Sequence, residues 1–553
     1  MKDTPMSCDY LVVGSGAAGS VVAARLSEDP DVSVMLLEAG GPNRSPLLRL
    51  PGLGFAAANH PRFNWGFRAD PVPEMENREL TWLQGRVLGG SSSINGMIYT
   101  RGHPREYDIW RQMGCDGWSF EDLLPHFRRS EANERGEGPW HGGAGPVQVR
   151  RACPGLPICD AFLAAAAEDG FPVLDDLNTD AGEGFALYDI NAGRGRRMSA
   201  ATAYLEPAAG RSNLHVRTGA LALRVLFEGR RASGVEALVG GRQVRIRARR
   251  EVVLSAGAIK SPQLLMLSGI GPADALSSHG IPVIHDAPNV GRNLQNHACY
   301  RLQYLCNAPV SASRHLRPHN AAAAVLRYAL FRSGPLAETY AVAGGYFRTD
   351  PALEVPDAQV VLLSALGPAR TGGATFRIRD LLPDRHGFGL TVYQGSPLSR
   401  GAVSLRSADP LDQPRIEAGY FSDPRDMEVL LKAVKRMRGM MRRPAMAKYI
   451  ERELLPGEAV SDDRSLETDI RRNGATAYHQ CGTCAMGPGG DSVVDSELRV
   501  RGVEGLRIAD ASIVPRIPNA ALHAPAIMIG EKAAALIGAE DAGSSLPVLN
   551  DRL

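Results

Sequence analysis

The chain has 553 residues, of which 44% are hydrophobic and 22% are charged, and its formal net charge is +2. This composition is typical of a soluble globular protein, and the length is sufficient for more than one large domain. The near-zero net charge gives no electrostatic basis for nucleic-acid binding or for attraction to an anionic membrane.

The first residues, Met1–Cys8, include acids and a proline but lack the apolar core of a signal peptide. The eight cysteines lie scattered along the chain, which is typical of reduced thiols in the cytoplasm. The longest apolar run, Asn320–Phe331, is interrupted by Arg327 and is too short to span a bilayer. The sequence therefore predicts a cytoplasmic protein without a membrane span.

Near the N-terminus, a glycine-rich turn lies between predicted secondary-structure elements. The strands are expected at Tyr10–Val13 and Val32–Leu37, and the helix at Ala18–Leu26. Gly14, Gly16 and Gly19 have the spacing that allows a tight turn, close approach to a pyrophosphate and close helix packing, and Glu38 can accept hydrogen bonds from a ribose. The helix N-terminus favours the negative phosphates. This unit predicts a dinucleotide site and leaves NAD and FAD as alternatives.

The next segment, Ala39–Asn95, is rich in glycine, proline and asparagine and predicts no long helix. Long loops in compact proteins are usually functional. Within and just after it, Gln84–Met97 concentrates glycines and small hydroxyl residues. One interpretation is a flexible turn, and the other is a loop whose N–H groups wrap an anionic or heteroaromatic ligand. The residues alone leave both open.

The middle of the chain changes from helical to strand patterns. Tyr107–Arg129 has the spacing of a helix whose tryptophans belong to the core, and Asn213–Leu254 predicts short antiparallel strands. Ser255–Pro262 is a second strand-to-helix junction of small residues, as expected beside a ligand. Residues 305–460 predict a second layer. Its helices are expected at Ala321–Arg332 and Asp426–Met441, and strands at Leu390–Tyr393 and Ala402–Leu405.

The segment Ala475–Gly487 contains His479, Cys481 and Cys484. A zinc site is disfavoured because structural zinc takes four ligands and no second cysteine or histidine pair lies nearby, so no metal is predicted. His479 has the side chain best suited to gain and lose a proton near neutral pH. A single histidine is more often structural than catalytic, so the residues alone leave its role open.

Downstream, Gly505–Pro515 is typical of a buried strand that ends in the acid Asp510. Small residues in Ile517–Pro525 then lead into a predicted helix at Ala526–Ile537. A helix that starts in this way presents free N–H groups and a positive dipole end. Such an end can hold a developing negative charge.

Taken in order, the motifs resemble those of the glucose-methanol-choline (GMC) oxidoreductases, flavoproteins that oxidise alcohols, and especially the choline-dehydrogenase-like members. The resemblance covers nearly the whole chain. It rests on the N-terminal glycines with Leu37–Gly40, and on Gly85–Asn95, Val290–Gln295, His479–Cys484 and Asp510–Ile513. Several motifs in the same order make it specific.

The resemblance implies an α/β fold, α+β overall, with a Rossmann-like FAD-binding domain and a substrate-binding domain whose antiparallel sheet is flanked by helices. The implied FAD-binding domain comprises 1–156, 205–304 and 461–553. The implied substrate-binding domain comprises 157–204 and 305–460.

The resemblance also implies FAD rather than NAD. Glu38 would bind the adenosine ribose, the backbone of Val216 would contact the adenine, and Gly89–Met97 would hold the flavin end. The residues implied to contact FAD are Gly14, Ser15, Gly16, Ala17, Ala18, Gly19, Glu38, Ala39, Trp65, Arg86, Gly89, Gly90, Ser93, Asn95, Gly96, Met97, Val216, Ala256, Asp510, Ala511, His523, Ala524 and Pro525. Some members bind FAD covalently through a histidine whose position here is Ile94, so dissociable, non-covalent FAD is predicted.

His479 corresponds to the catalytic histidine of the family, which accepts the alcohol proton as a hydride leaves for flavin N5. The second catalytic residue of the family, Asn or His, aligns with Ala521. Three options follow: His523 replaces the missing partner, Asn519 reaches the site, or His479 acts alone. The first is favoured. The family often has an aspartate where this chain has Asn296, a change whose consequence the sequence does not give.

The sequence therefore predicts oxidation of a primary alcohol to an aldehyde, with O₂ or another carrier as electron acceptor. The altered partner position points to a sugar-like, aminoglycoside-like or heteroaromatic alcohol, with simple aliphatic alcohols left open. The alternatives are a cyanohydrin lyase that uses FAD structurally, an inactive flavin-binding protein and an NAD dehydrogenase. The substrate, the choice between oxidase and dehydrogenase, and the oligomeric state do not follow from the sequence.

Overall fold

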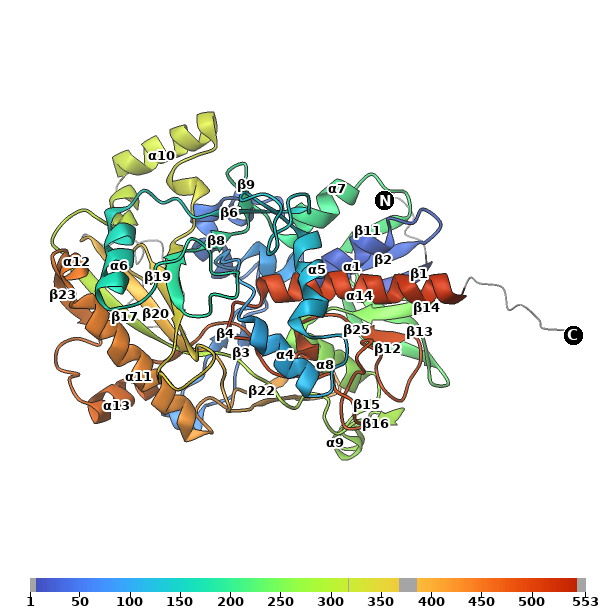
Figure 1. The fold of residues 1–553 in the computed structure, drawn as a ribbon. Helices are drawn as coiled ribbons and strands as arrows, with labels where there is room; N and C mark the ends of the chain where they lie inside the picture. Colours follow the sequence, from blue (N-terminus) through green and yellow to red (C-terminus); the bar gives the residue numbers. More distant parts are fainter. Residues whose placement is uncertain (1–5, 317, 368–384, 545–553) are drawn as a thin grey trace, which may run out of the picture.

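The computed structural model describes residues 6–316, 318–367 and 385–544. Its framework is two seven-stranded sheets, with helices packed around them (Figure 1). Residues 1–5, which belong to the segment expected to lack a signal peptide, lie outside this description. No helix in the described ranges is both long and apolar enough to cross a membrane.

The first sheet has a parallel core extended by an antiparallel meander. Its strands are β1 (Ser7–Val13), β2 (Val34–Glu38), β11 (Leu214–Thr218), β12 (Ala220–Glu228), β13 (Arg231–Val239), β14 (Arg242–Leu254) and β25 (Leu506–Ile508). Their order is β11-β2-β1-β14-β13-β12, with β25 paired to β14. β1 pairs in parallel with both β2 and β14, as a Rossmann-like unit requires. The predicted strand–helix–strand unit and the antiparallel strands are both confirmed.

Helix α1 (Ala17–Leu26) connects β1 to β2 and packs against the C-terminal helix α14 (His523–Ser544), which also contacts α5 (Phe120–Ser130) (Figure 1). The two helices approach closely, because a Cβ on Gly530 would lie 2.7 Å from the carbonyl oxygen of Ala18. A buried ion pair joins them, with Arg25 2.8 Å from Glu531. The last helix of the chain is thereby fixed against the first.

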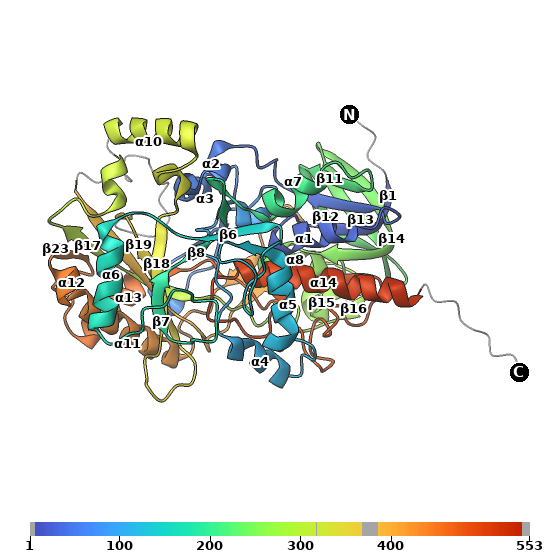
Figure 2. The ribbon, with the colours of Figure 1, turned by 45° about the horizontal axis from the view of Figure 1, so that its top comes forward.

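The second sheet is antiparallel. Its strands are β7 (Gly184–Leu187), β17 (Ala298–Cys306), β18 (Ala341–Phe347), β19 (Ala358–Leu363), β20 (Gly387–Gln394), β23 (Ile450–Leu455) and β24 (Ala475–Thr476). Helices α6 (Pro157–Glu168) and α11 (Pro424–Met441) pack beside it (Figure 2). β17 pairs with both β20 and β24. The expected domain boundary after residue 304 therefore falls inside a strand, and segment 461–553 contributes a strand to this sheet.

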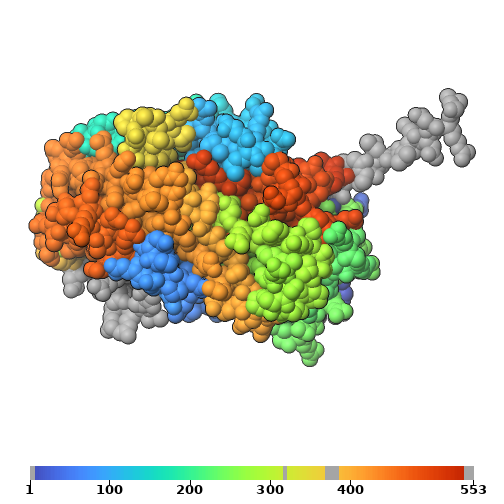
Figure 3. Space-filling view, turned by 90° about the horizontal axis from the view of Figure 1, so that it is seen from below, coloured from blue at the N-terminus to red at the C-terminus, as the bar shows by residue number. Residues whose placement is uncertain are grey.

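Segments far apart in sequence meet on the surface. Figure 3 shows a blue N-terminal segment lying against orange segments from the later half of the chain. One such contact is made by Asp70, whose carboxylate lies 3.2 Å from Arg406 and 3.1 Å from Arg415. Exposed pairs of this kind fix geometry more than they add stability.

Two local predictions were wrong. Tyr107–Arg129 forms two helices, α4 (Pro104–Gln112) and α5 (Phe120–Ser130), because Gly114 and Gly117 adopt positive φ angles of 89° and 78° between them. Trp110 and Trp118 are nonetheless buried, as expected. The strand expected at Ala402–Leu405 does not join the second sheet but forms a separate pair, β21 (Ala402–Ser404) with β22 (Arg415–Glu417). The other predicted helices are present at α8 (Gly257–Leu267), α10 (Pro318–Phe331) and α11.

A buried charge network lies between α5 and the loops beside it. His141 Nδ1 lies 2.7 Å from Glu131 and Nε2 lies 2.6 Å from Asp176, while Arg101 lies 2.7 Å from Glu131. Burial opposes protonation, but the hydrogen bonds to the two carboxylates raise the pKa of His141 from 6.5 to about 9. His141 is therefore a buried cation at neutral pH.

His141→Gln is expected to lower the unfolding temperature more at pH 6 than at pH 10. The raised pKa of the native histidine adds stability that is fully present below pH 6.5 and is lost as the pH rises through about 9. The shift corresponds to roughly 3 kcal/mol at most. Thermal unfolding across this pH range tests it, with His279→Gln at the end of α9 (Ala273–Ser278) as control. An equal loss at both pH values would contradict this role for His141.

Candidate active site

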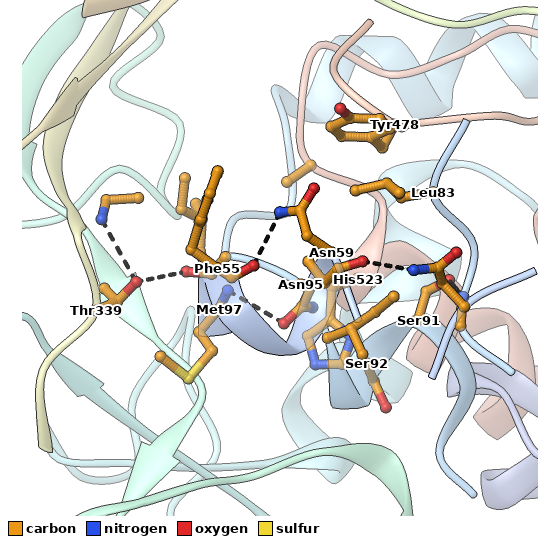
Figure 4. Close-up of a pocket in the computed structure, with 18 of the residues that line it drawn as sticks. Phe55, Asn59, Leu83, Ser91, Ser92, Asn95, Met97, Thr339, Tyr478 and His523 are labelled. Atoms are coloured by element: carbon orange, nitrogen blue, oxygen red, sulfur yellow. Dashed lines mark hydrogen bonds between the residues drawn. The ribbon is translucent and has the colours of Figure 1, made fainter. Parts of the chain in front are cut away.

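A cavity of about 2170 Å³ lies between the two sheets. Small-molecule sites usually measure about 300–1,000 Å³, so this cavity has room for a dinucleotide and a substrate together. It is lined by the turn after β1, the glycine-rich loop, one face of the second sheet, the His479 segment and the start of α14. Figure 4 shows side chains from the loop, from Thr339 and from His523 converging on it.

The glycines at one end form a cradle. Gly14 has φ +100°, and a Cβ there would lie 2.4 Å from the carbonyl oxygen of Ser255. A Cβ on Gly19 would lie 2.0 Å from the carbonyl oxygen of Gly14, so only glycine allows α1 to pack this closely. Gly16 lines the cavity, and a Cβ there would meet one atom within 4 Å, at 3.9 Å. The backbone at Gly16 is thus open to a ligand.

Glu38 connects this cradle to the glycine-rich loop. One carboxylate oxygen accepts hydrogen bonds from the Ser15 hydroxyl at 2.6 Å and the Ser15 N–H at 3.1 Å. The other oxygen accepts the Gly40 N–H at 2.7 Å, and Ser15 Oγ accepts the Gly89 N–H at 3.1 Å. Burial raises the pKa of Glu38. The loop is a packed wall of the cavity rather than an open turn.

Most residues implied to contact FAD line the cavity. They are Gly14, Ser15, Gly16, Ala17, Ala18, Glu38, Ala39, Trp65, Gly90, Asn95, Gly96, Met97, Ala256, Asp510, Ala511 and His523. Gly19, Arg86, Gly89, Ser93, Val216, Ala524 and Pro525 are outside the lining. Val216 is 39% exposed on β11, and the neighbouring Ala220–Ala222 line the cavity instead. Arg86 lies over the Trp65 ring, 4.7 Å from its centroid.

The sequence did not single out two further groups in the lining. Lys260 is buried on α8 with its Nζ 4.8 Å from the Trp65 ring centroid. Burial lowers the pKa of Lys260 to about 8, and the charge of Arg86 acts in the same direction. Thr339 and Tyr340, the second group, directly precede β18, and the Thr339 hydroxyl donates to the Gly96 carbonyl of the loop at 2.9 Å. Lys260 lies within the junction Ser255–Pro262 that the sequence placed beside a ligand, but its side chain was not singled out there, and Thr339 and Tyr340 belong to no motif.

Asp510 ties the end of β25 to the start of α8. One carboxylate oxygen accepts the Gly257 N–H at 2.8 Å and the Ser261 hydroxyl at 2.6 Å. The other accepts the Ser512 N–H at 2.8 Å. These bonds hold the two cavity-lining junctions, Ser255–Pro262 and Asp510–Ala511, next to each other.

His479 lines the cavity beside a second histidine, His297, which directly precedes β17. The Nδ1 atoms of His479 and His297 lie 2.9 Å apart, and His297 Nε2 lies 2.8 Å from the carbonyl oxygen of Gly395. His297 stacks on Tyr393, with ring centroids 5.8 Å apart. His297 is fully buried, and burial lowers its pKa to about 4.

This geometry determines the tautomer of His479. The Gly395 carbonyl can only accept, so His297 Nε2 must donate to it. Neutral His297 then has an unprotonated Nδ1, which accepts the hydrogen bond from His479 Nδ1. Burial lowers the pKa of His479 well below 6.5, so this ring is neutral as well. Its Nε2 is therefore the unprotonated nitrogen, which a general base requires.

Asn296 holds the backbone of the same histidine. Its side-chain oxygen accepts the His479 N–H at 2.8 Å, and its amide donates to Thr476 Oγ1 at 2.9 Å. Through these two bonds Asn296 joins the Thr476 side chain to the backbone of His479.

The structure gives different surroundings to the two candidates for the second catalytic residue, His523 and Asn519. His523 and Ala521 line the cavity, whereas Asn519 is outside the lining and donates to the Pro356 carbonyl at 2.6 Å. His523 is buried as the first residue of α14, and burial lowers its pKa to about 3. Its Nε2 is buried without a hydrogen-bond partner in the described residues. His523 is thus a neutral ring with one unsatisfied nitrogen.

The cysteines of the His479 segment are not arranged as ligands. Burial raises the pKa of both Cys481 and Cys484, so both are thiols. Within the described ranges no group of three histidine, cysteine, aspartate or glutamate side chains is placed to hold a metal ion.

The site fits FAD on two independent observations. The glycine cradle and Glu38 are arranged as a pyrophosphate and ribose site requires. At the other end, His523 lines the same cavity, and its buried Nε2 has no hydrogen-bond partner in the described residues. One elongated ligand can reach both ends.

Comparison with known proteins identifies the family. The N- and C-terminal models of the GMC oxidoreductases match residues 8–299 and 397–530. The chain belongs to the GMC oxidoreductase family. It is an FAD-dependent oxidoreductase that acts on CH–OH donors.

The relatives align with almost the whole chain. This GMC oxidoreductase is 41% identical to the oxygen-dependent choline dehydrogenase of Brucella anthropi over 530 residues, which are 96% of this chain and 95% of the relative. The crystal structure of pyridoxine 4-oxidase from Mesorbium loti matches with a TM-score of 0.86 at 32% identity, covering 96% of this chain and 99% of that one. Formate oxidase matches with a TM-score of 0.90 at 27% identity, covering 98% and 100%.

Proposed function

We propose that this GMC oxidoreductase oxidises a primary alcohol to an aldehyde, with His479 as the general base. The observation that carries the proposal is the pair of histidines: His297 holds His479 through Nδ1 and leaves Nε2 unprotonated in the cavity wall. Bound FAD supplies the hydride acceptor. His479 takes the hydroxyl proton at Nε2 as the hydride leaves the carbinol carbon.

The start of α14 and His523 serve the same step. The first hydrogen bond of this helix runs from the Ala526 N–H to the Leu522 carbonyl at 3.0 Å. The N–H groups of His523 and Ala524 therefore have no partners within the helix, which supports a role in binding negative charge. These groups and the helix dipole stabilise negative charge beside the cavity. The neutral His523 ring offers Nε2 to the substrate oxygen or to the cofactor, as replacement for the partner missing at Ala521.

The test is an anaerobic screen of alcohols that follows bleaching of the yellow flavin and formation of aldehyde. Bleaching by a primary alcohol is the expected result. A cyanohydrin lyase or an inactive flavoprotein would keep its flavin oxidised in every alcohol, and an NAD dehydrogenase would purify colourless. Repeating the screen in air with peroxide detection decides whether O₂ or another carrier takes the electrons.

We propose that FAD is bound non-covalently. Ile94 occupies the position of the covalent histidine in some relatives, and its aliphatic side chain is buried and has no group that could bond to flavin. Acid precipitation is expected to release all of the yellow colour into the supernatant. Colour that stays with the precipitated protein, at one flavin per chain, would refute this.

His297→Ala is expected to slow anaerobic flavin reduction by roughly 10–100-fold, because His479 loses the acceptor that fixes its tautomer. Substrate affinity should change less than the rate, since His297 lies behind His479. His279→Ala, at the C-terminal end of α9 and outside the cavity lining, serves as control. If the substrate concentration for half-maximal flavin reduction rose strongly while the maximal rate stayed unchanged, a positioning role for His297 would be contradicted.

The cytoplasmic location remains a proposal. It is supported by the cysteines, all eight of which are free thiols.

A further inference from the structure

The substrate end of the cavity contains an arginine that the proposed mechanism does not use. β17 alternates its side chains, and Cys299, Arg301 and Gln303 all line the cavity. On the neighbouring strand, Thr391 and Tyr393 of β20 line it too. Arg301 therefore lies on the sheet face that closes the cavity opposite the glycine-rich loop.

The strand register separates Arg301 from the proposed general base, His479, by about the length of a small substrate. Cys299 is paired with Tyr393, whose ring centroid lies 6.0 Å from that of His479. Arg301 is paired with Thr391, two residues further along. Two residues of strand span about 7 Å. A guanidinium at this distance can contact the far end of an alcohol whose carbinol group is at His479.

Arg301 has no carboxylate to neutralise it among the residues described. Its Nε is buried without a hydrogen-bond partner there. Only three carboxylates line the described cavity, and each is engaged elsewhere. Glu38 binds Ser15 and Gly40, Asp510 binds the α8 start, and Glu338 lies 2.8 Å from Arg150.

The charge of Arg301 reaches the substrate space. Burial raises the pKa values of Tyr478, Tyr340 and Cys299, and in each case the Arg301 charge opposes the rise. All three side chains line the cavity. Further along the lining, towards α10, the charges are again positive: Arg314, Arg327 and Arg332. A part of a cavity whose charges share one sign concentrates ligands of the opposite sign.

We infer that Arg301 binds a carboxylate on the substrate, so that this enzyme oxidises an anionic alcohol rather than a quaternary amine. The inference rests on the proposed alcohol oxidation and names its substrate class. A guanidinium pairs with a carboxylate through two parallel hydrogen bonds. A cationic alcohol such as choline would meet a like charge without a free carboxylate to offset it. The same argument disfavours an aminoglycoside-like substrate.

Binding is tested first, with calorimetric titration of the FAD-loaded enzyme by two unreactive ligands of the same shape, para-methylbenzoate and para-methylbenzamide. The acid should bind at least about tenfold more tightly than the amide. Hydrogen bonds to charged groups contribute more binding free energy than neutral ones, and the difference corresponds to roughly that factor. Arg301→Gln should remove the preference and Arg301→Lys should keep part of it. Arg105→Gln, the same change at an exposed arginine of α4, should keep all of it.

Oxidation is tested separately, by anaerobic flavin bleaching with para-(hydroxymethyl)benzoate, its amide and para-(aminomethyl)benzyl alcohol. The acid should reduce the flavin most efficiently and the amine least, and Arg301→Glu should reverse the order. Equal binding of acid and amide, no binding of the acid, or preference for the amine would overturn the inference. Arg301-dependent binding of the acid without bleaching by any alcohol would leave the anion site intact and refute the proposed oxidation.

Discussion

His479→Ala is expected to reduce the anaerobic rate of flavin bleaching by roughly 10²–10⁴-fold, the usual contribution of a positioned general base. In the native enzyme the rate should stay constant as the pH falls through 6.5, because burial lowers the pKa of His479 well below that value and keeps its Nε2 unprotonated. Stopped-flow absorbance of the flavin measures both effects.

The variant must keep its FAD for this result to count, which the visible spectrum shows directly. His523→Ala is the informative companion, because His523 contacts the same cavity through a neutral ring. If it shares the step, the reduction rate of His523→Ala falls as well, though less than that of His479→Ala. An unchanged rate in His523→Ala would remove His523 from the mechanism and leave His479 to act alone.

Gly19→Ala is expected to abolish stable flavin binding. A Cβ at this position would lie 2.0 Å from the carbonyl oxygen of Gly14 and 2.8 Å from the Ser255 side chain. Helix α1 must move away from β1, at a cost of about 1–3 kcal/mol or more for overpacking, and the cradle at Gly14 and Gly16 moves with it. The flavin content of the purified variant and its unfolding temperature measure the effect.

Gly41→Ala provides a matched control, because nothing lies within 4 Å of a Cβ built at that glycine. It is a glycine of the same region, just beyond Glu38. Its flavin content should equal that of the native chain. If Gly19→Ala also retained its full complement of flavin, the assignment of the nucleotide end to this cradle would be wrong.

The sequence predicted the nucleotide half best. The glycines and the acid act within one strand–helix–strand unit, where spacing along the chain translates directly into position in space. The same holds for the last helix: the sequence predicted its start at Ala526, and the structure has α14 begin at His523. Helices with a regular apolar stripe, such as α11, were also predicted correctly. The failure at Tyr107–Arg129 arose because apolar spacing was carried across two glycines that interrupt the helix.

The substrate half could not be predicted in this way. His297 is 182 residues from His479, and the two meet only because β17 pairs with β24. Alternation along β17 shows that Arg301 and Cys299 share a face, but which face closes the cavity depends on the pairing with β20. The sequence recognised Asn296 as unusual and gave no consequence, since Thr476 comes beside it through the same pairing.

By itself, then, the sequence determined a dinucleotide fold with its glycine cradle, its acid and one conspicuous histidine. Those features depend on local backbone geometry, which residue type and spacing control directly. Only the tertiary structure decided that His297 holds this histidine in its basic tautomer and that Arg301 faces the space beyond it. Sheet pairings between distant segments create these contacts, and they depend on the packing of the whole chain.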